Sequence, residues 1–215
     1  IAFGTRVDFD GVTLEGIERI SIDDIRHAAD MGFRIKLLGV AQMTESGLEQ
    51  RMTPCLVPAT SPLGQLENAT NMVVLEGDAV GQIILRGAGA GEGPTASAVL
   101  GDIADIARGI LPPTFGQPAE TLIAANAVAS AGAAPFYLRM TLRDRPGALA
   151  RIATALGDAG ISIDRMRQYG HAGAEAPVLI VTHACERDAL DGAITAFSDT
   201  GVLIGAPVAM RIDAV

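Results

Sequence analysis

The residues best suited to chemistry form a glycine-rich segment between an apolar run and a helical pattern. Glycine stands at four alternate positions, and a Pro-Thr pair follows: Gly87, Gly89, Gly91, Gly93, Pro94 and Thr95. Glycine tolerates positive φ and has no Cβ, so the loop can fold tightly and let a ligand approach its backbone. Proline suits the first turn of a helix, and the free N–H groups at a helix N-terminus attract a phosphate or a carboxylate. The segment therefore indicates an anion site built from backbone atoms.

This glycine segment departs from the common nucleotide-binding motifs. In the G-x-G-x-x-G fingerprint of dinucleotide-binding proteins, Glu92 or Pro94 would occupy the position of the third glycine. The phosphate-loop pattern G-x-x-x-x-G-K-[ST] does not occur in the chain. A flexible connector between a strand and a helix explains the same residues, so the residues alone leave both interpretations open.

A second turn that could bind a ligand lies between another apolar alternation and another helical pattern. Backbone N–H groups near Gly147 can receive a carboxylate, and Asp144 can pair with an amino group. A plain helix start accounts for Pro146 and Gly147 equally well.

The histidines and the lysine do not form a recognisable site. His27, His171 and His183 are far apart and belong to no H-x-x-x-H or H-E-x-x-H pattern, so we expect no metal site. Lys36 is the one lysine in the sequence, and its alternation with apolar neighbours indicates a strand residue, not a catalytic one.

Several elements are predicted in the first half of the chain. Ser21 is a suitable N-cap for a helix that ends at Gly32 and buries a stripe of Ile22, Ile25, Ala28 and Ala29. Residues 34–41 and 49–57 are predicted strands, the second stopped by prolines 54 and 58, and residues 62–68 a short helix.

The elements around the glycine segment are a hairpin and a long helix. Residues 71–76 and 79–85 flank Gly77-Asp78 and predict a β-hairpin whose second strand leads into the glycines. Apolar residues recur at helical spacing over 94–109, which predicts a helix buried on one side.

The second half contains a duplicated β-α-β pattern. Strands are predicted over 136–142, 161–169, 178–183 and 202–212, with a helix between the strands of each pair. Two such units predict a ferredoxin-like sandwich. The fold class is therefore α+β: a mixed β-sheet with helices over 1–112, a linker rich in Pro, Gly and Ala over 113–133, and a ferredoxin-like βαββαβ unit over 134–215.

The composition restricts the partners. The chain has 215 residues, 49% hydrophobic and 19% charged, with a net charge of −9. This acidity argues against binding nucleic acid or an anionic membrane, and no apolar run is long enough to span a bilayer. Cys55 and Cys185 are expected to be free, buried thiols in a cytoplasmic protein. The start at Ile1 indicates a piece of a longer protein.

The first half of the chain resembles the homoserine dehydrogenases. Five segments in the same order carry this resemblance: Ile1-Ala-Phe-Gly-Thr5, Glu15-Gly-Ile17, Ile35-Lys-Leu-Leu-Gly39, Val74-Leu-Glu-Gly-Asp78 and the glycine segment up to Val99. The family interconverts homoserine and aspartate semialdehyde by hydride transfer with NAD or NADP. The resemblance implies that the cofactor contacts the glycine segment, through Gly87, Gly89, Gly91, Pro94 and Thr95.

The resemblance also implies what the chain lacks. The family's catalytic lysine, the acidic residues that hold homoserine and the Rossmann domain would all precede Ile1. We therefore expect no catalytic residue in this chain and no activity from it alone.

The second half resembles the ACT domain, a module that senses small molecules in amino-acid biosynthesis. The segments that carry this resemblance are Leu142-Arg-Asp-Arg-Pro-Gly-Ala-Leu149 and Gly160-Ile-Ser-Ile163. The resemblance implies an amino-acid effector, with L-threonine as the end product to test. It would be bound near Asp144, Gly147, Ala148 and Leu149, and against Ile161 and Ile163 of a partner ACT domain.

Three functional interpretations follow. The chain is the C-terminal portion of a homoserine dehydrogenase, or a non-catalytic module that binds an amino acid and dimerises, or a dimerisation unit without a ligand. A homodimer or homotetramer is expected in each case, because open sheet edges and an exposed face of the ACT sheet need to be covered.

Overall fold

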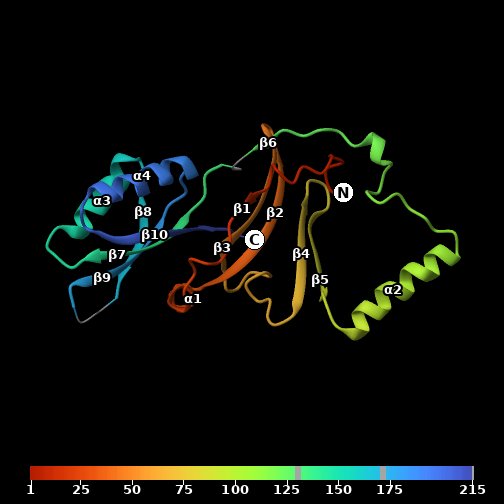
Figure 1. Cartoon of the computed structure of the whole chain (residues 1–215), viewed down its shortest axis with the longest axis horizontal. Helices are drawn as coiled ribbons and strands as arrows, with labels where there is room; N and C mark the ends of the chain where they lie inside the picture. The colour runs from red at the N-terminus through yellow and green to blue at the C-terminus, as the bar shows by residue number, and fades with distance from the viewer. Residues whose placement is uncertain (129–131, 170–172, 215) are drawn as a thin grey trace.

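The computed structural model describes residues 1–128, 132–169 and 173–214. Figure 1 shows a sheet with two helices at one end, a long strand pair in the middle, and a hairpin followed by a helix at the other end. The predicted α+β class is confirmed.

The C-terminal unit is the predicted ferredoxin-like sandwich. Its strands are β7 (Phe136–Arg143), β8 (Ile163–Gln168), β9 (Glu175–Thr182) and β10 (Leu203–Ile212), in the antiparallel order β10-β7-β9-β8. The helices α3 (Ala148–Asp158) and α4 (Arg187–Asp199) pack on one face of these strands. Alternate residues of the strands and the apolar stripes of the helices form this core, in which Leu138, Ile152, Leu156 and Phe197 are fully buried.

The N-terminal half contributes a long antiparallel strand pair, β2 (Phe33–Thr44) and β3 (Gly47–Pro58). The other edge of β3 pairs in turn with two short strands, β6 (Ala127–Val128) and β1 (Thr13–Leu14), and with the end of β10. Because Arg211 and Ile212 of β10 pair with Cys55 and Leu56, the sheet continues from one half of the chain into the other.

Two predictions for this half were wrong. Strand β3 does not stop at Pro54, because that residue lies between the parts of β3 that pair with β1 and with β10. A missing N–H is tolerated where no neighbouring strand needs it. Residues 62–68 form turns and not a helix. The last residue of this segment, Asn68, has a positive φ of 57°.

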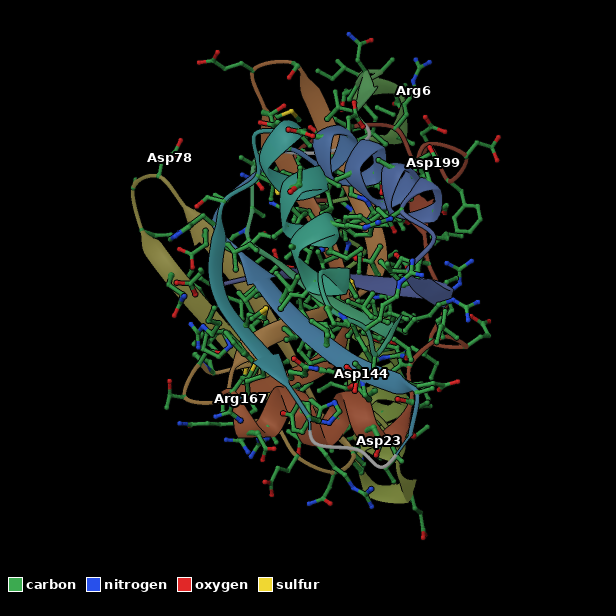
Figure 2. The ribbon with its side chains drawn as sticks, turned by 90° about the vertical axis from the view of Figure 1, so that its left-hand side faces the viewer. Arg6, Asp23, Asp78, Asp144, Arg167 and Asp199 are labelled. Atoms are coloured by element: carbon green, nitrogen blue, oxygen red, sulfur yellow. The ribbon has the colours of Figure 1, made fainter. Side chains whose placement is uncertain are left out.

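Helix α1 (Ile22–Asp30) forms where predicted but buries a different face. Ile22 and Ile25 are exposed, whereas Asp24 and Ala28 are fully buried. Of the four residues predicted as the buried stripe, Ala28 is buried and Ile22, Ile25 and Ala29 are not, because α1 packs against the face of the C-terminal sheet that α3 and α4 leave open. Figure 2 shows this layering, with α1 and the labelled Asp23 on the opposite side of the strands from α3 and α4.

An apolar cluster joins α1 and β2 to the C-terminal sheet. Its members are Ala28, Leu56, Tyr137, Leu179, Val181, Val208, Met210 and Ile212, with Met31, Phe33 and Ile35 packed against them. The expectation of an exposed ACT sheet face was therefore wrong, because this chain covers that face itself.

The predicted hairpin and the helix after it extend away from this body. Strands β4 (Thr70–Gly77) and β5 (Gly81–Ala88) form a separate two-stranded sheet, and α2 (Glu92–Ala107) follows (Figure 1). All of α2 belongs to the described residues, and none of its side chains is buried. The predicted burial of one side does not occur within this chain. A short 3-10 turn, η1 (Ala119–Thr121), lies on the way back to β6.

Candidate functional sites

The glycine segment joins β5 to α2, as the sequence predicts. Gly87 lies on β5, Gly89 follows that strand, and Gly91 is the N-cap of α2 with a φ of 121°. A side chain is strained at such a φ, so Gly91 is needed for its backbone conformation. A Cβ at Gly89 would lie 1.3 Å from Nδ2 of Asn71, so a larger residue there requires the end of the Asn71 side chain to move.

The start of α2 presents backbone donors to solvent. The N-cap residue offers no side-chain hydrogen bond to the first turn, and Thr95 N donates to the Gly91 carbonyl at 3.1 Å. Pro94 lies in this first turn, where it lacks an N–H to offer. The amides of Glu92 and Gly93 therefore remain as donors for an anionic group. Such donors suit an anionic group, for example a phosphate of a dinucleotide cofactor.

A cavity of about 230 Å³ lies at the second predicted site, where β7 turns into α3. The predicted residues Asp144, Gly147, Ala148 and Leu149 line it. Gly147 caps α3 with a φ of 81°. The Ala148 amide donates to the Arg145 carbonyl at 3.1 Å, which leaves the next amides of the first turn, those of Leu149 and Ala150, as candidate donors.

Ile161 and Ile163 lie elsewhere. Ile161 is buried in the core between the sheet and α3, and Ile163 packs against the same core, so neither lines the cavity.

The cavity has further walls that the sequence analysis missed. Arg143 and Arg145 flank Asp144, while Gln168, Ala176 and Val178 close the cavity from β8 and β9. The position of Ala176 and Val178 could have been predicted from the sequence. Strands β7 and β9 are neighbours in a ferredoxin-like sheet, and Leu142 pairs with Ala176. Charges of both signs and the amides in the first turn of α3 suit a zwitterion, which carries a carboxylate and an ammonium group.

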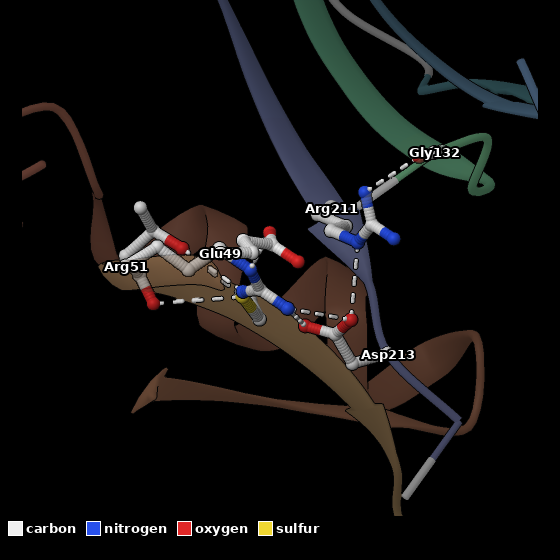
Figure 3. A network of polar contacts seen from close by, with 7 residues as sticks. Glu49, Arg51, Gly132, Arg211 and Asp213 are labelled. Carbon is white, nitrogen blue, oxygen red and sulfur yellow. Dashed lines mark hydrogen bonds and ion pairs between the residues drawn. The ribbon is translucent and has the colours of Figure 1, made fainter. Parts of the chain in front are cut away.

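A buried polar network ties β3 to the end of the chain (Figure 3). The Arg51 guanidinium donates to Glu49 at 3.0 Å and to both carboxylate oxygens of Asp213, at 3.0 and 3.1 Å. Asp213 also accepts from Arg211, which donates in turn to the Gly132 carbonyl. Burial lowers the pKa of Arg51, but the Asp213 carboxylate and its other partners outweigh this and raise it.

The Cys55 thiol lies beside this network and is buried. Burial, with the nearby Asp213 carboxylate, raises the pKa of Cys55 to about 11. Burial likewise raises the pKa of Cys185. Both cysteines are free and buried, as predicted.

A second buried polar cluster joins α1 to β7. The Asp24 carboxylate is fully buried and accepts from Tyr137 Oη at 3.1 Å and from Arg139 Nε at 2.5 Å. Its other oxygen accepts from the backbone N–H and hydroxyl of Ser21, both at 2.8 Å. Burial and the Asp24 carboxylate raise the pKa of Tyr137. The sequence analysis placed an N-cap at Ser21 but missed Asp24 and its partners across the sheet.

The remaining candidates have structural surroundings. Lys36 lies on β2 as predicted and donates to the Leu66 carbonyl. His27 stacks on the Tyr169 ring with centroids 3.9 Å apart, and His171 lies outside the described residues. Across residues 1–128, 132–169 and 173–214, no group of acidic, histidine and cysteine side chains is arranged to hold a metal ion. In the same ranges, no helix has the length and apolar character needed to cross a membrane.

Comparison with known proteins agrees with both resemblances. Residues 1–104 match the homoserine dehydrogenase family, and residues 136–201 match the ACT domain. The homoserine dehydrogenase of Pseudomonas aeruginosa is 34% identical over 99% of this chain, which covers 51% of that protein. That of Neisseria gonorrhoeae is 37% identical over 91% of this chain and 47% of its own length.

A solved structure extends the match to three dimensions. The crystal structure of a homoserine dehydrogenase from Thiobacillus denitrificans superposes with a TM-score of 0.87 at 34% identity, over 99% of this chain and 50% of that one. Residues 1–104 thus match the homoserine dehydrogenase family, and almost the whole chain is similar to proteins of that name. The chain corresponds to the C-terminal region of the family with its ACT domain, and it spans about half the length of the curated relatives it matches.

The family match clarifies where the candidate sites lie. The glycine segment falls inside the part that matches homoserine dehydrogenases, and the cavity falls inside the part that matches the ACT domain. The two buried polar clusters lie between these parts, since Asp24 and Arg51 belong to the first, Tyr137 and Arg139 to the second, and Asp213 follows it.

Proposed function

We propose that this chain is the C-terminal part of an NAD- or NADP-dependent homoserine dehydrogenase, which interconverts L-homoserine and L-aspartate 4-semialdehyde. The observation that carries the proposal is the match of almost the whole chain, in sequence and in fold, to homoserine dehydrogenases about twice as long. Such an enzyme serves threonine, methionine and isoleucine biosynthesis, and a cytoplasmic location goes with this role.

In this proposal the glycine segment contacts the nicotinamide cofactor, which exchanges a hydride with the substrate. The contacts come from Gly87, Gly89, Gly91, Pro94 and Thr95, through a backbone that has no Cβ at its glycines and through the donors at the start of α2. Backbone contacts of this kind serve NAD and NADP alike. The catalytic lysine and the Rossmann domain belong to another part of the full-length enzyme.

The strand and the helix on either side of this loop expose apolar side chains, which supports the proposal that another part of the full-length protein packs against them. On β5 and α2, Ile83, Leu85, Leu100, Ile103 and Ile106 are between 39% and 64% exposed. Surfaces of this kind are rare on monomers and mark places where other protein packs.

Enzyme assays on two proteins test the proposal: the 215-residue chain, and a chain extended upstream through the Rossmann domain. We expect homoserine-dependent reduction of NAD or NADP from the longer protein only. In that protein Gly91→Val should weaken cofactor binding by about tenfold or more, because valine cannot adopt the positive φ without strain. Gly101→Ala on α2 is the matched control, since a Cβ there meets open space and φ is not positive. An unchanged dissociation constant for Gly91→Val would contradict the role of the loop.

We also propose that the ACT cavity binds an amino-acid effector, with L-threonine as the first ligand to test. Asp144 would pair with the ammonium group, and the amides of Leu149 and Ala150 in the first turn of α3 would receive the carboxylate. In a homodimer or homotetramer, the partly buried Ile163 would act from a partner ACT domain, whereas the Ile161 side chain stays in its own core.

Calorimetry of the 215-residue chain with L-threonine tests this site. We expect binding heat from the wild type and at least about tenfold weaker binding from Asp144→Asn, which removes the charge that faces the ammonium group. Asp158→Asn, at the exposed end of α3, should bind like the wild type. Absence of heat with threonine, isoleucine and methionine would favour a unit without a ligand. Heat in this chain, combined with no turnover by the extended one, would favour the non-catalytic amino-acid-binding module.

A further inference from the structure

Strand β7 carries both a wall of the cavity and the contacts to α1. Its last residues, Leu142 and Arg143, line the cavity together with Asp144. Near its start, Tyr137 and Arg139 point to the opposite face of the sheet and donate to Asp24. A change at the cavity therefore needs to travel only a few residues along one strand to reach α1.

The contacts of Asp24 are sensitive to small displacements. The carboxylate is completely buried, and its partners are the guanidinium of Arg139, the hydroxyl of Tyr137 and the N-cap Ser21. A buried carboxylate that loses a partner bears a large desolvation penalty, so α1 and β7 favour moving together. Arg139 adds a second link, because its Nη2 donates to the Arg19 carbonyl just before α1.

Helix α1 contacts both β7 and the start of β2, so it connects the C-terminal sheet with the strand pair of the first half. Ala28 belongs to the apolar cluster that includes Tyr137, and Phe33 and Ile35 at the start of β2 pack against that cluster. Strand β2 pairs along its whole length with β3, which belongs to the part that matches homoserine dehydrogenases. The path from the cavity to that part consists of packed and hydrogen-bonded contacts throughout.

We propose that the cluster of Asp24, Tyr137 and Arg139, called here the α1–β7 joint, transmits occupancy of the ACT cavity to the homoserine dehydrogenase part of the chain. The proposal rests on the function proposed above in that the cavity receives an amino acid. Arg139 and Tyr137 act as positioning residues: neither lines the cavity, and their role is to couple the position of α1 to that of β7.

Hydrogen–deuterium exchange of the 215-residue chain tests the joint in two arms. One arm adds saturating L-threonine, and the other introduces Ala150→Phe, which places a bulky side chain at the exposed wall of the cavity and needs no ligand. We expect the amides of α1 to change their exchange rate by about fivefold in each arm, which is a modest allosteric coupling. With Arg139→Gln or Tyr137→Phe this response of α1 should disappear.

Controls separate coupling from folding and from ligand binding. Arg26→Gln removes an ion pair on the same helix, in which the side chains of Arg26 and Asp23 are 69% and 63% exposed. This exposed pair contributes little, so the variant should leave the response of α1 unchanged. The Arg139 variant should bind L-threonine within about twofold of the wild type and show the same protection in α3 and α4, which excludes a merely structural effect. A response of α1 that persists in both joint variants would overturn the proposal, as would an unresponsive α1 in wild type with Ala150→Phe. Absence of threonine binding with a positive Ala150→Phe arm would refute the proposed effector and support the joint.

Discussion

Helices α2 and α3 have similar apolar spacing but opposite surroundings. On α3, Ile152 and Leu156 are completely buried between the sheet and α4. On α2, Leu100 and Ile103 are 64% and 56% exposed, and the helix extends from the body of the molecule (Figure 1). The comparison teaches that periodic apolar residues indicate a face to be covered but do not identify the element that covers it.

The strands show the same contrast. Strand β7 is buried on both faces, by α3 and α4 on one side and by α1 on the other. Every residue of β5 is exposed, although Ile83, Ile84 and Leu85 are as apolar as the residues of β7. The arm formed by β4, β5 and α2 therefore carries apolar residues typical of a protein interior, but no other part of the described chain packs over β5 and α2.

The largest expected difference between the two regions concerns ion pairs. Arg51→Met should lower the free energy of unfolding by about 3–5 kcal/mol, because it leaves the buried carboxylates of Glu49 and Asp213 without their shared cation. The matched change on the arm is Arg108→Met, which removes an ion pair whose side chains, Arg108 and Asp105, are 70% and 52% exposed. It should lower the free energy of unfolding by less than about 0.5 kcal/mol. Urea unfolding followed by far-UV circular dichroism measures both. Equal losses would contradict the contrast between body and arm.

A core truncation should have the next largest effect. Leu156→Ala removes a completely buried side chain between α3 and the sheet, and we expect a loss of about 3 kcal/mol. Thermal and urea unfolding of the purified variant give this value. A loss below about 1 kcal/mol would mean that the core residues move in to fill the space left by the leucine side chain, which would contradict tight packing.

Alkaline pH should destabilise the body through Cys55. The pKa of this thiol is about 11 in the folded chain against 9.0 in the unfolded chain, so its stabilising contribution is complete below about pH 9. It is lost as the pH rises from 9 to about 11, and it amounts to about 3 kcal/mol at most. Urea unfolding at several pH values between these limits should show a steeper decline for wild type than for Cys55→Ala. Parallel curves would show that the thiol does not contribute.

The smallest effect is expected on the arm, and it should depend on chain length. In the 215-residue chain, Ile103→Ala should change stability by less than about 0.5 kcal/mol, because the side chain is 56% exposed. In a protein extended upstream, the same change should cost about 2 kcal/mol or more if the added part packs on α2. Unfolding measurements on the two proteins compare these values. An equally small cost in both would show that α2 stays exposed.

Much of the local structure could be read from the residues. The duplicated β-α-β pattern predicted both the antiparallel sheet and the helix between its first two strands, which is α3. The glycine segment was correctly placed between a strand and a helix, since Gly91 and Pro94 have strong local preferences. The four predicted residues from Asp144 to Leu149 line one cavity because they are neighbours in the chain.

The sequence by itself determined those elements whose causes lie within a few residues: helix caps, glycine conformations and apolar alternation along single strands. Only the tertiary structure decided that α1 turns Asp24 inward, that β3 passes through Pro54, and that β10 continues the sheet into the first half. The physical reason is that burial is a property of pairs of surfaces. Asp24 is a helix-capping residue in its own segment and becomes the centre of a buried cluster only when Tyr137 and Arg139 reach it from more than a hundred residues away.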